Sequence, residues 1–435
     1  MNIQSGTGSG LKWLFVDMNS YFASVEQDAD PRLRGRPVAV VPMMTDSTCA
    51  IAASYEAKAY GIRTGTKIYD ARRLCPKLIC VLARHDVYTS YHNQILKTVE
   101  NYLPINKVWS IDEFDCELMG QQTCPDNARK IASAIKEAIH REVGSAIHCS
   151  IGIAPNSFLA KVATEIEKPN GLVLLPFEAL PVRLFDLKLT DLPGINVNME
   201  ERLRRARITS VRALWDTSPK QARAIWGSVQ GERFWHWLHG HDIPYHTTKP
   251  STIGHSRVLD PDLRRGEKAR LMARRLLVKA AIRLRRKGFY AGRLSLSVRL
   301  LDGRRWAGEA DFPAAHDPFT FLEHLDTLWS RMLDESFGTH RPKHFGRLAN
   351  FKKIATILHG LSLNGQITDD LFDTGFTENR AVFGKRERLV AALDKLHDKH
   401  KRELVQLGVT PKTLAGHVGT KIAFSRVPDE EEFWE

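Results

Sequence analysis

The chain has 435 residues, of which 43% are hydrophobic and 26% charged, and its formal net charge is +13. This length predicts about three or four domains, and the positive charge indicates nucleic acid, or an anionic membrane surface, as a partner. No uncharged apolar run reaches about 18 residues, which excludes a membrane-spanning helix, and MNIQSGTGSG lacks the pattern of a signal peptide. Six scattered cysteines without a CxxC pair argue against zinc and against a disulfide framework, and favour the cytoplasm.

The first element is a short apolar run, residues 13–16, that ends at Asp17. Such a run predicts a buried strand that delivers a carboxylate to its end. The next predicted elements are a helix from Ser20 to about Gln27, strands at 36–42 and 48–53, and a helix from Tyr55 to Tyr60 that Gly61 ends.

Residues 108–113 repeat the opening pattern, because an apolar strand is again followed by carboxylates, Asp112 and Glu113. The elements predicted after it are a helix over 125–143, a strand over 148–154, a helix over 157–166 and a turn at 168–171. A sheet crossed by helices that receives acids from two strands is typical of an α+β catalytic domain.

Short helices follow from about residue 175, and one of them carries Arg202, Arg204 and Arg205. Residues 243–251 lack periodicity and are interpreted as a linker. Beyond them the pattern predicts a β-α-β-β-α-β domain, in which strand 294–300 alternates apolar and polar residues. The remaining predictions are helices at about 264–287 and 317–336, a loose stretch at 361–384 and a helix at 385–405.

Asp17, Asp112 and Glu113 form the candidate catalytic group. Three acids at the ends of neighbouring strands can hold two divalent cations about 4 Å apart. Oxygen ligands favour Mg²⁺, with Mn²⁺ as a substitute. A strand-end aspartate is more often a helix cap or a salt-bridge partner, so this pattern alone leaves both readings open.

Four motifs resemble the Y family of translesion DNA polymerases, in its bacterial DinB-UmuC-like branch. They occur in the family's order at compatible spacing, and the resemblance extends over about 13–360. The four segments are Val16-Asp17-Met18-Asn19-Ser20-Tyr21-Phe22-Ala23-Ser24-Val25-Glu26, Tyr55-Glu56-Ala57-Lys58-Ala59-Tyr60-Gly61-Ile62-Arg63, Ser110-Ile111-Asp112-Glu113, and Phe158-Leu159-Ala160-Lys161-Val162-Ala163 with Lys168-Pro169-Asn170-Gly171.

The resemblance implies an α+β, multidomain right-hand polymerase with palm, fingers, helical thumb and β-α-β-β-α-β little finger. The implied division is palm at 1–19 and 84–174, fingers at 20–83, thumb at 175–242, linker at 243–251, little finger at 252–360 and a tail at 361–435.

The resemblance also assigns roles around the acids. Asp17 and Asp112 would bridge two Mg²⁺ ions, Glu113 would complete the site, and the backbone carbonyl of Met18 would be a further ligand. The residues expected to hold the nucleotide are Met18, Phe22, Tyr55, Lys58 and Lys168. Among them Phe22 would exclude the 2′-hydroxyl, so that deoxynucleotides are preferred.

DNA is expected at two places beyond the acids. The thumb hairpin at 192–195 resembles a phosphate-binding helix-hairpin-helix, although Asn196 stands where the family has a glycine. Residues 264–293 hold twelve Lys or Arg and one acid, which favours contact with DNA phosphates. The residues predicted to share the DNA-binding face are Lys268, Arg275, Lys279, Arg283 and Arg286.

Two further features concern single residues. After the acid pair the family has a small residue and then an aromatic one, whereas this chain has Phe114 and Asp115. Asp115 is either an extra metal ligand or a surface acid. Gln366, Leu371 and Phe372 resemble a peptide that binds a sliding clamp, although the glutamine is farther from the Leu-Phe pair than in the family. The alternative is that Leu371 and Phe372 fold back onto the little finger.

The sequence is therefore interpreted as a DNA-directed DNA polymerase, and the family resemblance implies low fidelity and lesion bypass. It would bind primer-template DNA, deoxynucleoside triphosphates and a clamp, avoid membranes, and act as a cytoplasmic monomer. Two alternatives stay open: a catalytically weak or inactive scaffold of the same family, and a two-metal nuclease. Primer extension with Mg²⁺ and deoxynucleotides separates the three.

Overall fold

The computed structural model describes residues 10–245, 250–338, 350–363, 376–400, 405, 407–408 and 427–428, with the main chain alone for 376–383. The chain divides into two compact units. The first comprises Met1–Tyr245 with Thr420–Phe433, and the second His246–Gly419 with Trp434–Glu435.

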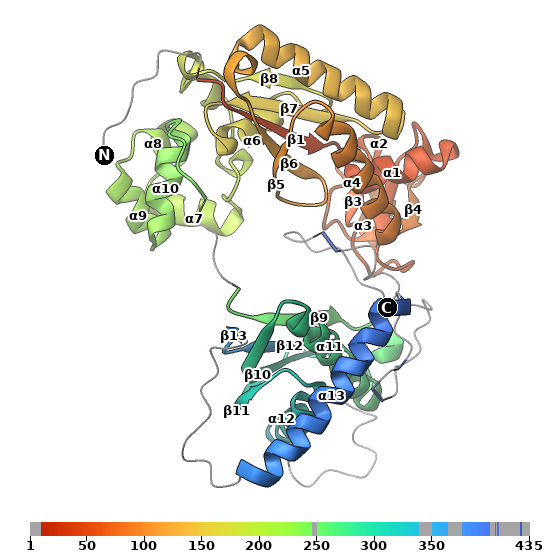
Figure 1. Cartoon of the computed structure of the whole chain (residues 1–435). Helices are drawn as coiled ribbons and strands as arrows, with labels where there is room; N and C mark the ends of the chain where they lie inside the picture. The colour runs from red at the N-terminus through yellow and green to blue at the C-terminus, as the bar shows by residue number, and fades with distance from the viewer. Residues whose placement is uncertain are drawn as a thin grey trace. The chain divides into compact units, whose positions relative to one another are not determined.

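The first unit is built on a five-stranded sheet in the order β5-β6-β1-β7-β8 (Figure 1). Neighbouring strands are antiparallel except β7 and β8. The strands are β1 (Trp13–Met18), β5 (Ile105–Val108), β6 (Glu113–Glu117), β7 (Cys149–Ala154) and β8 (Leu172–Leu174).

Alternation along β1 assigns the two faces of this sheet. Leu14, Val16 and Met18 pack into a core shared with helices α4 and α5, whereas Phe15 packs into a second core with α6. Since side chains two apart share a face, Asp17 lies on the α6 side. These helices are α4 (His85–Glu100), α5 (Pro125–Ala138), which continues as a π-helical turn over Ile139–Val143, and α6 (Ser157–Ile166).

A smaller sheet, ordered β3-β2-β4, belongs to the same unit. Its strands surround an apolar core of small side chains that includes Ala39, Ala53 and Ala57. The elements are α1 (Tyr21–Ala29), β2 (Val38–Val41), β3 (Ala52–Ala53), α2 (Tyr55–Lys58), α3 (Ile68–Leu74) and β4 (Ile79–Leu82).

Four short helices complete the first unit and are grouped together in Figure 1. Phe234 and Trp237 of α10 pack on Phe158 of α6, which ties this group to the main sheet. The helices are α7 (Val197–Arg205), α8 (Val211–Trp215), α9 (Pro219–Trp226) and α10 (Val229–Leu238).

The second unit has a sheet ordered β11-β10-β12-β9, with β13 paired to β10. Its helices α11 and α12 share one apolar core with the sheet. The predicted β-α-β-β-α-β order is confirmed by β9 (Ile253–Val258), α11 (Gly266–Arg286), β10 (Phe289–Leu300), β11 (Arg305–Ala315), α12 (Pro318–Phe337) and β12 (Phe351–His359). Two elements follow, β13 (Ser362–Leu363) and α13 (Phe376–His400).

Two sequence predictions are wrong in detail. The strand expected at 108–111 ends at Val108, because the amide groups of Trp109 and Ser110 both donate to the Glu113 carbonyl and close a turn. Glu113 therefore begins β6 and Asp112 lies in the turn before it, so neither acid follows directly on β5. The last helix begins at Phe376, nine residues before the predicted start, within a stretch that was expected to be loose. In the described part of the chain, no helix is long and apolar enough to cross a membrane.

Candidate active site

The three predicted acids come together at one end of the main sheet. Asp17 on β1 lies directly opposite Glu113 on β6 in the antiparallel register. Asp112 precedes Glu113 in the turn between β5 and β6, and its carbonyl accepts a hydrogen bond of 2.9 Å from the Met18 amide. Two neighbouring strands and one turn thus position the carboxylates.

Buried polar groups hold this turn in place. Nδ1 of His92, on α4, lies 2.7 Å from the Ile111 carbonyl, and the Ser110 hydroxyl donates to Asp112 Oδ1 at 2.6 Å. Burial lowers the pKa of His92, so the neutral ring is favoured. The residue before Asp112 is therefore fixed by a helix that packs behind the sheet.

Asp112 itself lies in an unfavourable place for a negative charge. Burial, the largest effect, raises its pKa to about 6. The hydrogen bond from Ser110 opposes this shift, whereas the charges of Glu113 and Asp17 add to it. A carboxylate that resists ionisation in this way is stabilised by any nearby cation.

Two lysines supply positive charge to the acids. Lys161 Nζ contacts Asp17 Oδ2, and lies 3.0 Å from both Glu113 Oε1 and Glu165 Oε1. Lys168 Nζ lies 2.9 Å from Asp17 Oδ2 and 2.7 Å from Glu165 Oε1. Burial alone would lower the pKa of Lys161, but the carboxylates outweigh it and raise that pKa well above its ordinary value.

The opposite wall comes from the smaller sheet and its helices. Lys58 Nζ lies 4.3 Å from the centre of the Tyr55 ring, an arrangement that permits a cation–π interaction. Burial and the positive charge of Lys168 lower the pKa of Lys58. Burial, the largest effect, and the negative charges of Asp17 and Glu165 raise the pKa of Tyr55 to about 12.

Phe22, on α1, lines the same cavity as the acids. Its ring stacks on Tyr88 with centroids 4.2 Å apart and 14° between the planes. The Tyr88 hydroxyl donates to Glu26 at 2.7 Å, and Glu26 also accepts from Arg84. The position of the Phe22 ring is therefore braced from behind.

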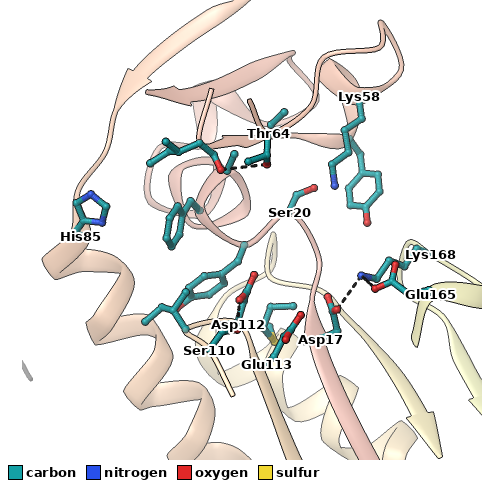
Figure 2. Close-up of a pocket in the computed structure, with 18 of the residues that line it drawn as sticks. Asp17, Ser20, Lys58, Thr64, His85, Ser110, Asp112, Glu113, Glu165 and Lys168 are labelled. Atoms are coloured by element: carbon teal, nitrogen blue, oxygen red, sulfur yellow. Dashed lines mark hydrogen bonds and ion pairs between the residues drawn. The ribbon is translucent and has the colours of Figure 1, made fainter. Parts of the chain in front are cut away.

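These groups line one cavity of about 520 Å³. In Figure 2, Asp17, Asp112 and Glu113 gather on one side, and Lys58 and Thr64 face them across the space. The residues predicted from sequence that line it are Asp17, Met18, Phe22, Tyr55, Lys58, Asp112, Glu113 and Lys168.

The donor chemistry of the acids fits a hard divalent cation. Asp17, Asp112 and Glu113 offer only oxygen, the ligand type that Mg²⁺ prefers, and burial, which raises the pKa of Asp112, leaves that carboxylate poorly solvated. As they stand, no three acidic, histidine or cysteine side chains among the described residues converge closely enough to hold a metal ion. The ammonium group of Lys161 lies between Asp17 and Glu113 instead.

Comparison with known proteins identifies the family. Models described as the impB/mucB/samB family and its C-terminal domain match residues 16–165 and 250–370. A DNA polymerase IV of Moorella thermoacetica is 31% identical over 404 residues, covering 91% of this chain and 95% of the relative. One of Halorhodospira halophila is 31% identical over 337 residues, covering 76% and 92%. The chain belongs to the Y family of DNA polymerases.

Solved structures agree on the fold. A Y-family DNA polymerase chimera of Dbh and Dpo4 has a TM-score of 0.67 at 21% identity, with 81% of this chain and 100% of the chimera covered. An insertion ternary complex of Dbh DNA polymerase has a TM-score of 0.53 at 22% identity, with the same coverage. The predicted α+β polymerase fold is confirmed, and the chain is a DNA-directed DNA polymerase of the translesion type.

Asp115 is buried and hydrogen-bonded in this polymerase. It is 1% exposed and accepts hydrogen bonds from Asn106 at 2.9 Å, Trp109 at 2.8 Å and Ser157 at 2.5 Å. Its oxygens face the start of α6 and the β5–β6 turn. The expectation of a surface acid is therefore wrong, and three donors occupy the oxygens that an extra metal ligand would need.

The hairpin at 192–195 forms with Asn196 in an extended backbone conformation. Asn196 has φ −89°, and its side chain caps α7 by accepting from the Met199 amide at 2.9 Å. Gly194 adopts φ +89° instead. Since asparagine is a good N-cap, the substitution suits the turn, and phosphate binding there stays a prediction.

The basic residues of α11 are not all exposed on one face, contrary to the prediction from sequence. Arg275 and Lys279 are only 7% and 8% exposed, because α11 packs against the sheet and α12 instead of standing free. Arg283 is half-buried and donates to the Gly254 carbonyl at 3.1 Å. The prediction of one exposed face shared by all five basic residues is therefore wrong. Lys268 and Arg286 are exposed, and their contact with DNA stays a prediction.

A different basic surface lies on the open face of the sheet in the second unit. Arg299 on β10 is paired with Arg305 on β11 and with Lys353 on β12, and all three are exposed. Arg293, on the same face of β10, is paired instead with acids, since its Nε lies 2.5 Å from Asp311 Oδ1. Sequence reasoning missed this row because only strand register reveals it.

Other predicted and unpredicted residues remain. Gln366, Leu371 and Phe372 lie outside the described residues, so the clamp peptide stays a prediction. The polar cavity residues that sequence reasoning did not single out are Ser20, Thr64, His85, Ser110, Lys161 and Glu165. Lys161 lies inside a quoted motif, and its spacing of four from Glu165 was the signal that could have found both.

Proposed function

We propose that this polymerase adds deoxynucleotides to a primer 3′ end by two-metal catalysis and bypasses lesions with low fidelity. The observation that carries the proposal is one cavity that joins Asp17, Asp112 and Glu113 to Lys58, Lys168 and Tyr55. In this proposal residues 1–19 and 84–174 are the palm, 20–83 the fingers, 175–242 the thumb and 252–360 the little finger.

The acids would hold two Mg²⁺ ions through their carboxylates and the Met18 carbonyl. Such ions lower the pKa of an attacking hydroxyl and neutralise charge on the transferring phosphate. The chain's own contribution is geometric: β-register places Asp17 opposite Glu113, and His92 with Ser110 fixes the turn that carries Asp112.

The triphosphate would lie between the acids and the wall made by α2. Lys58, Tyr55 and Lys168 line the cavity and offer two ammonium groups and a hydroxyl toward it. Charge that builds on phosphate oxygens during transfer is stabilised by such preorganised donors. Lys168 would exchange its contacts with Asp17 and Glu165 for the phosphates.

Phe22 would select the sugar. Its ring cannot retreat from the nucleotide, because Tyr88 stacks behind it and is itself held by a hydrogen bond to Glu26. A fixed ring beside C2′ leaves no space for an additional hydroxyl. Template tolerance would come from the opposite side of the cavity, where Ala52 and Ala53 are small.

Primer-template DNA would lie on the open face of the sheet in the second unit. Arg299, Arg305 and Lys353 are neighbours across three strands, and like charges directly opposite each other are unfavourable unless an anion lies between them. A DNA phosphate supplies that anion and carries no base information, which suits an enzyme that accepts any template.

Primer extension tests the proposal. The purified chain, Mg²⁺ and all four deoxynucleotides should lengthen a labelled primer on an undamaged template and past an abasic site. Asp112→Asn, which changes one oxygen to nitrogen in the same volume, should abolish both reactions. Shortening of the primer would indicate a nuclease, and binding of DNA without extension would indicate a scaffold.

A further inference from the structure

Lys161 is a buried ammonium group at the centre of the proposed metal site. Its side chain is 15% exposed and contacts Asp17 on β1, Glu113 on β6 and Glu165 on its own helix. It therefore joins the two strands whose carboxylates would share a cation. A lysine in this position makes some of the contacts that the metal would otherwise make.

Charge balance explains why the ammonium lies there. Asp17, Asp112, Glu113 and Glu165 carry four negative charges when ionised, against the two ammonium groups of Lys161 and Lys168. Carboxylates close together and partly buried repel one another. Removing a cation from such a group leaves uncompensated charge, which costs far more than losing a surface ion pair.

Glu165 gives the ammonium of Lys161 a partner outside the three proposed metal-binding acids. It lies one helical turn after Lys161, at the spacing where side chains of one helix meet, and its Oε1 is 3.0 Å from Lys161 Nζ. Lys161 can therefore leave Asp17 and Glu113 by a rotation of its side chain and keep an ion pair. The backbone of α6 need not move.

We propose that Lys161 is a resident counter-cation of the acid cluster. It holds Asp17 and Glu113 together in the absence of metal and competes with the divalent cation for these two carboxylates. When the cation binds, the ammonium group leaves them and keeps Glu165 as its partner. This inference rests on the proposed metal site. In this arrangement free metal binds the polymerase weakly, and the site fills when a nucleotide brings its own cation and triphosphate.

Mn²⁺ binding to the full chain, without DNA or nucleotide, tests the inference. Free Mn²⁺ is followed by electron paramagnetic resonance at fixed pH and salt. Lys161→Met should bind Mn²⁺ roughly tenfold more tightly, because the cation no longer has to displace an ion pair, and Lys161→Arg should bind like the parent. A lysine that merely supports the fold predicts the opposite sign, so weaker or unchanged binding by Lys161→Met would overturn the inference.

Three controls separate the possible failures. Lys130→Met removes an exposed charge from α5 and should leave the midpoint of the Mn²⁺ titration unchanged. Asp17→Asn should lose Mn²⁺ binding, and if it binds like the parent, the proposed metal site is wrong and the inference falls with it. Glu165→Gln should weaken binding in the parent but change little in Lys161→Met, and equal weakening in both would mean that Glu165 acts without the lysine.

Thermal unfolding gives a second measure that does not depend on catalysis. In chelator, Lys161→Met should unfold at a lower temperature than the parent, because the carboxylates lose their counter-cation. Addition of Mg²⁺ should then raise its Tm by more than it raises the Tm of the parent, since a ligand that binds the folded state more tightly stabilises it more. An equal rise in both proteins would contradict the inference.

Discussion

Replacement of Asp115 by alanine should destabilise the first unit by about 2–4 kcal/mol, because the buried Ser157 hydroxyl and the partly buried Trp109 ring N–H both lose their acceptor. The carboxylate is 1% exposed and accepts from three donors, on Asn106, Trp109 and Ser157. A buried donor left without its partner costs about 1–3 kcal/mol. Ser157 is buried and should bear the full cost, whereas Asn106 is exposed and can bond to water instead.

Urea unfolding followed by tryptophan fluorescence measures this loss, and Trp109 is one of the nine tryptophans that contribute to the signal. The exposed Asp186→Ala is the matched control and should change the free energy of unfolding by less than about 0.5 kcal/mol. Mn²⁺ affinity of the folded Asp115→Ala protein should stay within about threefold of the parent, or about 0.7 kcal/mol. A loss of stability below about 1 kcal/mol, or a large loss of Mn²⁺ affinity, would refute the structural role.

Three further predictions concern sugar choice, acid stability and DNA binding. Phe22→Ala should raise the ratio of ribonucleotide to deoxynucleotide kcat/KM by roughly a hundredfold or more, and an unchanged ratio would return the ring to a packing role. Burial lowers the pKa of His92 in the folded protein, so its neutral form contributes stability that is present above the unfolded pKa of 6.5 and is lost as pH falls through the folded pKa. His92→Gln should therefore flatten the fall in Tm between about pH 7.5 and 5. The same dependence of Tm on pH in the variant and the parent would count against this. Changing Arg299, Arg305 and Lys353 to Gln should weaken primer-template binding and reduce its salt slope by about 2.7, at about 0.9 for each phosphate contact, while an unaltered slope would place the DNA elsewhere.

Much of the fold follows from local patterns in the sequence. The run before Asp17 is apolar at every position, as in a strand covered on both faces, and β1 is that strand. Alternation in 294–300 likewise predicted β10 and the face it buries. These predictions hold because each depends on neighbours within one strand.

Predictions that depend on packing between elements were less accurate. The lysines and arginines of α11 have the spacing of a solvated face, yet Arg275 and Lys279 are covered, because burial of a helix is decided by what packs around it. The row of Arg299, Arg305 and Lys353 depends on register between three strands that are distant in sequence.

The candidate site shows the same division. Motifs supplied the three acids and the nucleotide residues, and the cavity contains them all. The role of Asp115 stayed open, because its donors Asn106 and Ser157 lie on different elements. The ammonium of Lys161 among the acids was missed for the same reason.

Single-nucleotide incorporation under single-turnover conditions, with DNA and nucleotide saturating, tests the central claim most directly. The claim is that Asp17, Asp112 and Glu113 assemble the metals that drive nucleotide addition. Asp112→Ala should reduce the rate by about a thousandfold or more, as expected when several kcal/mol of transition-state stabilisation are lost, while primer-template affinity stays within about threefold of the parent. A rate near that of the parent, in protein free of host polymerase, would contradict the claim.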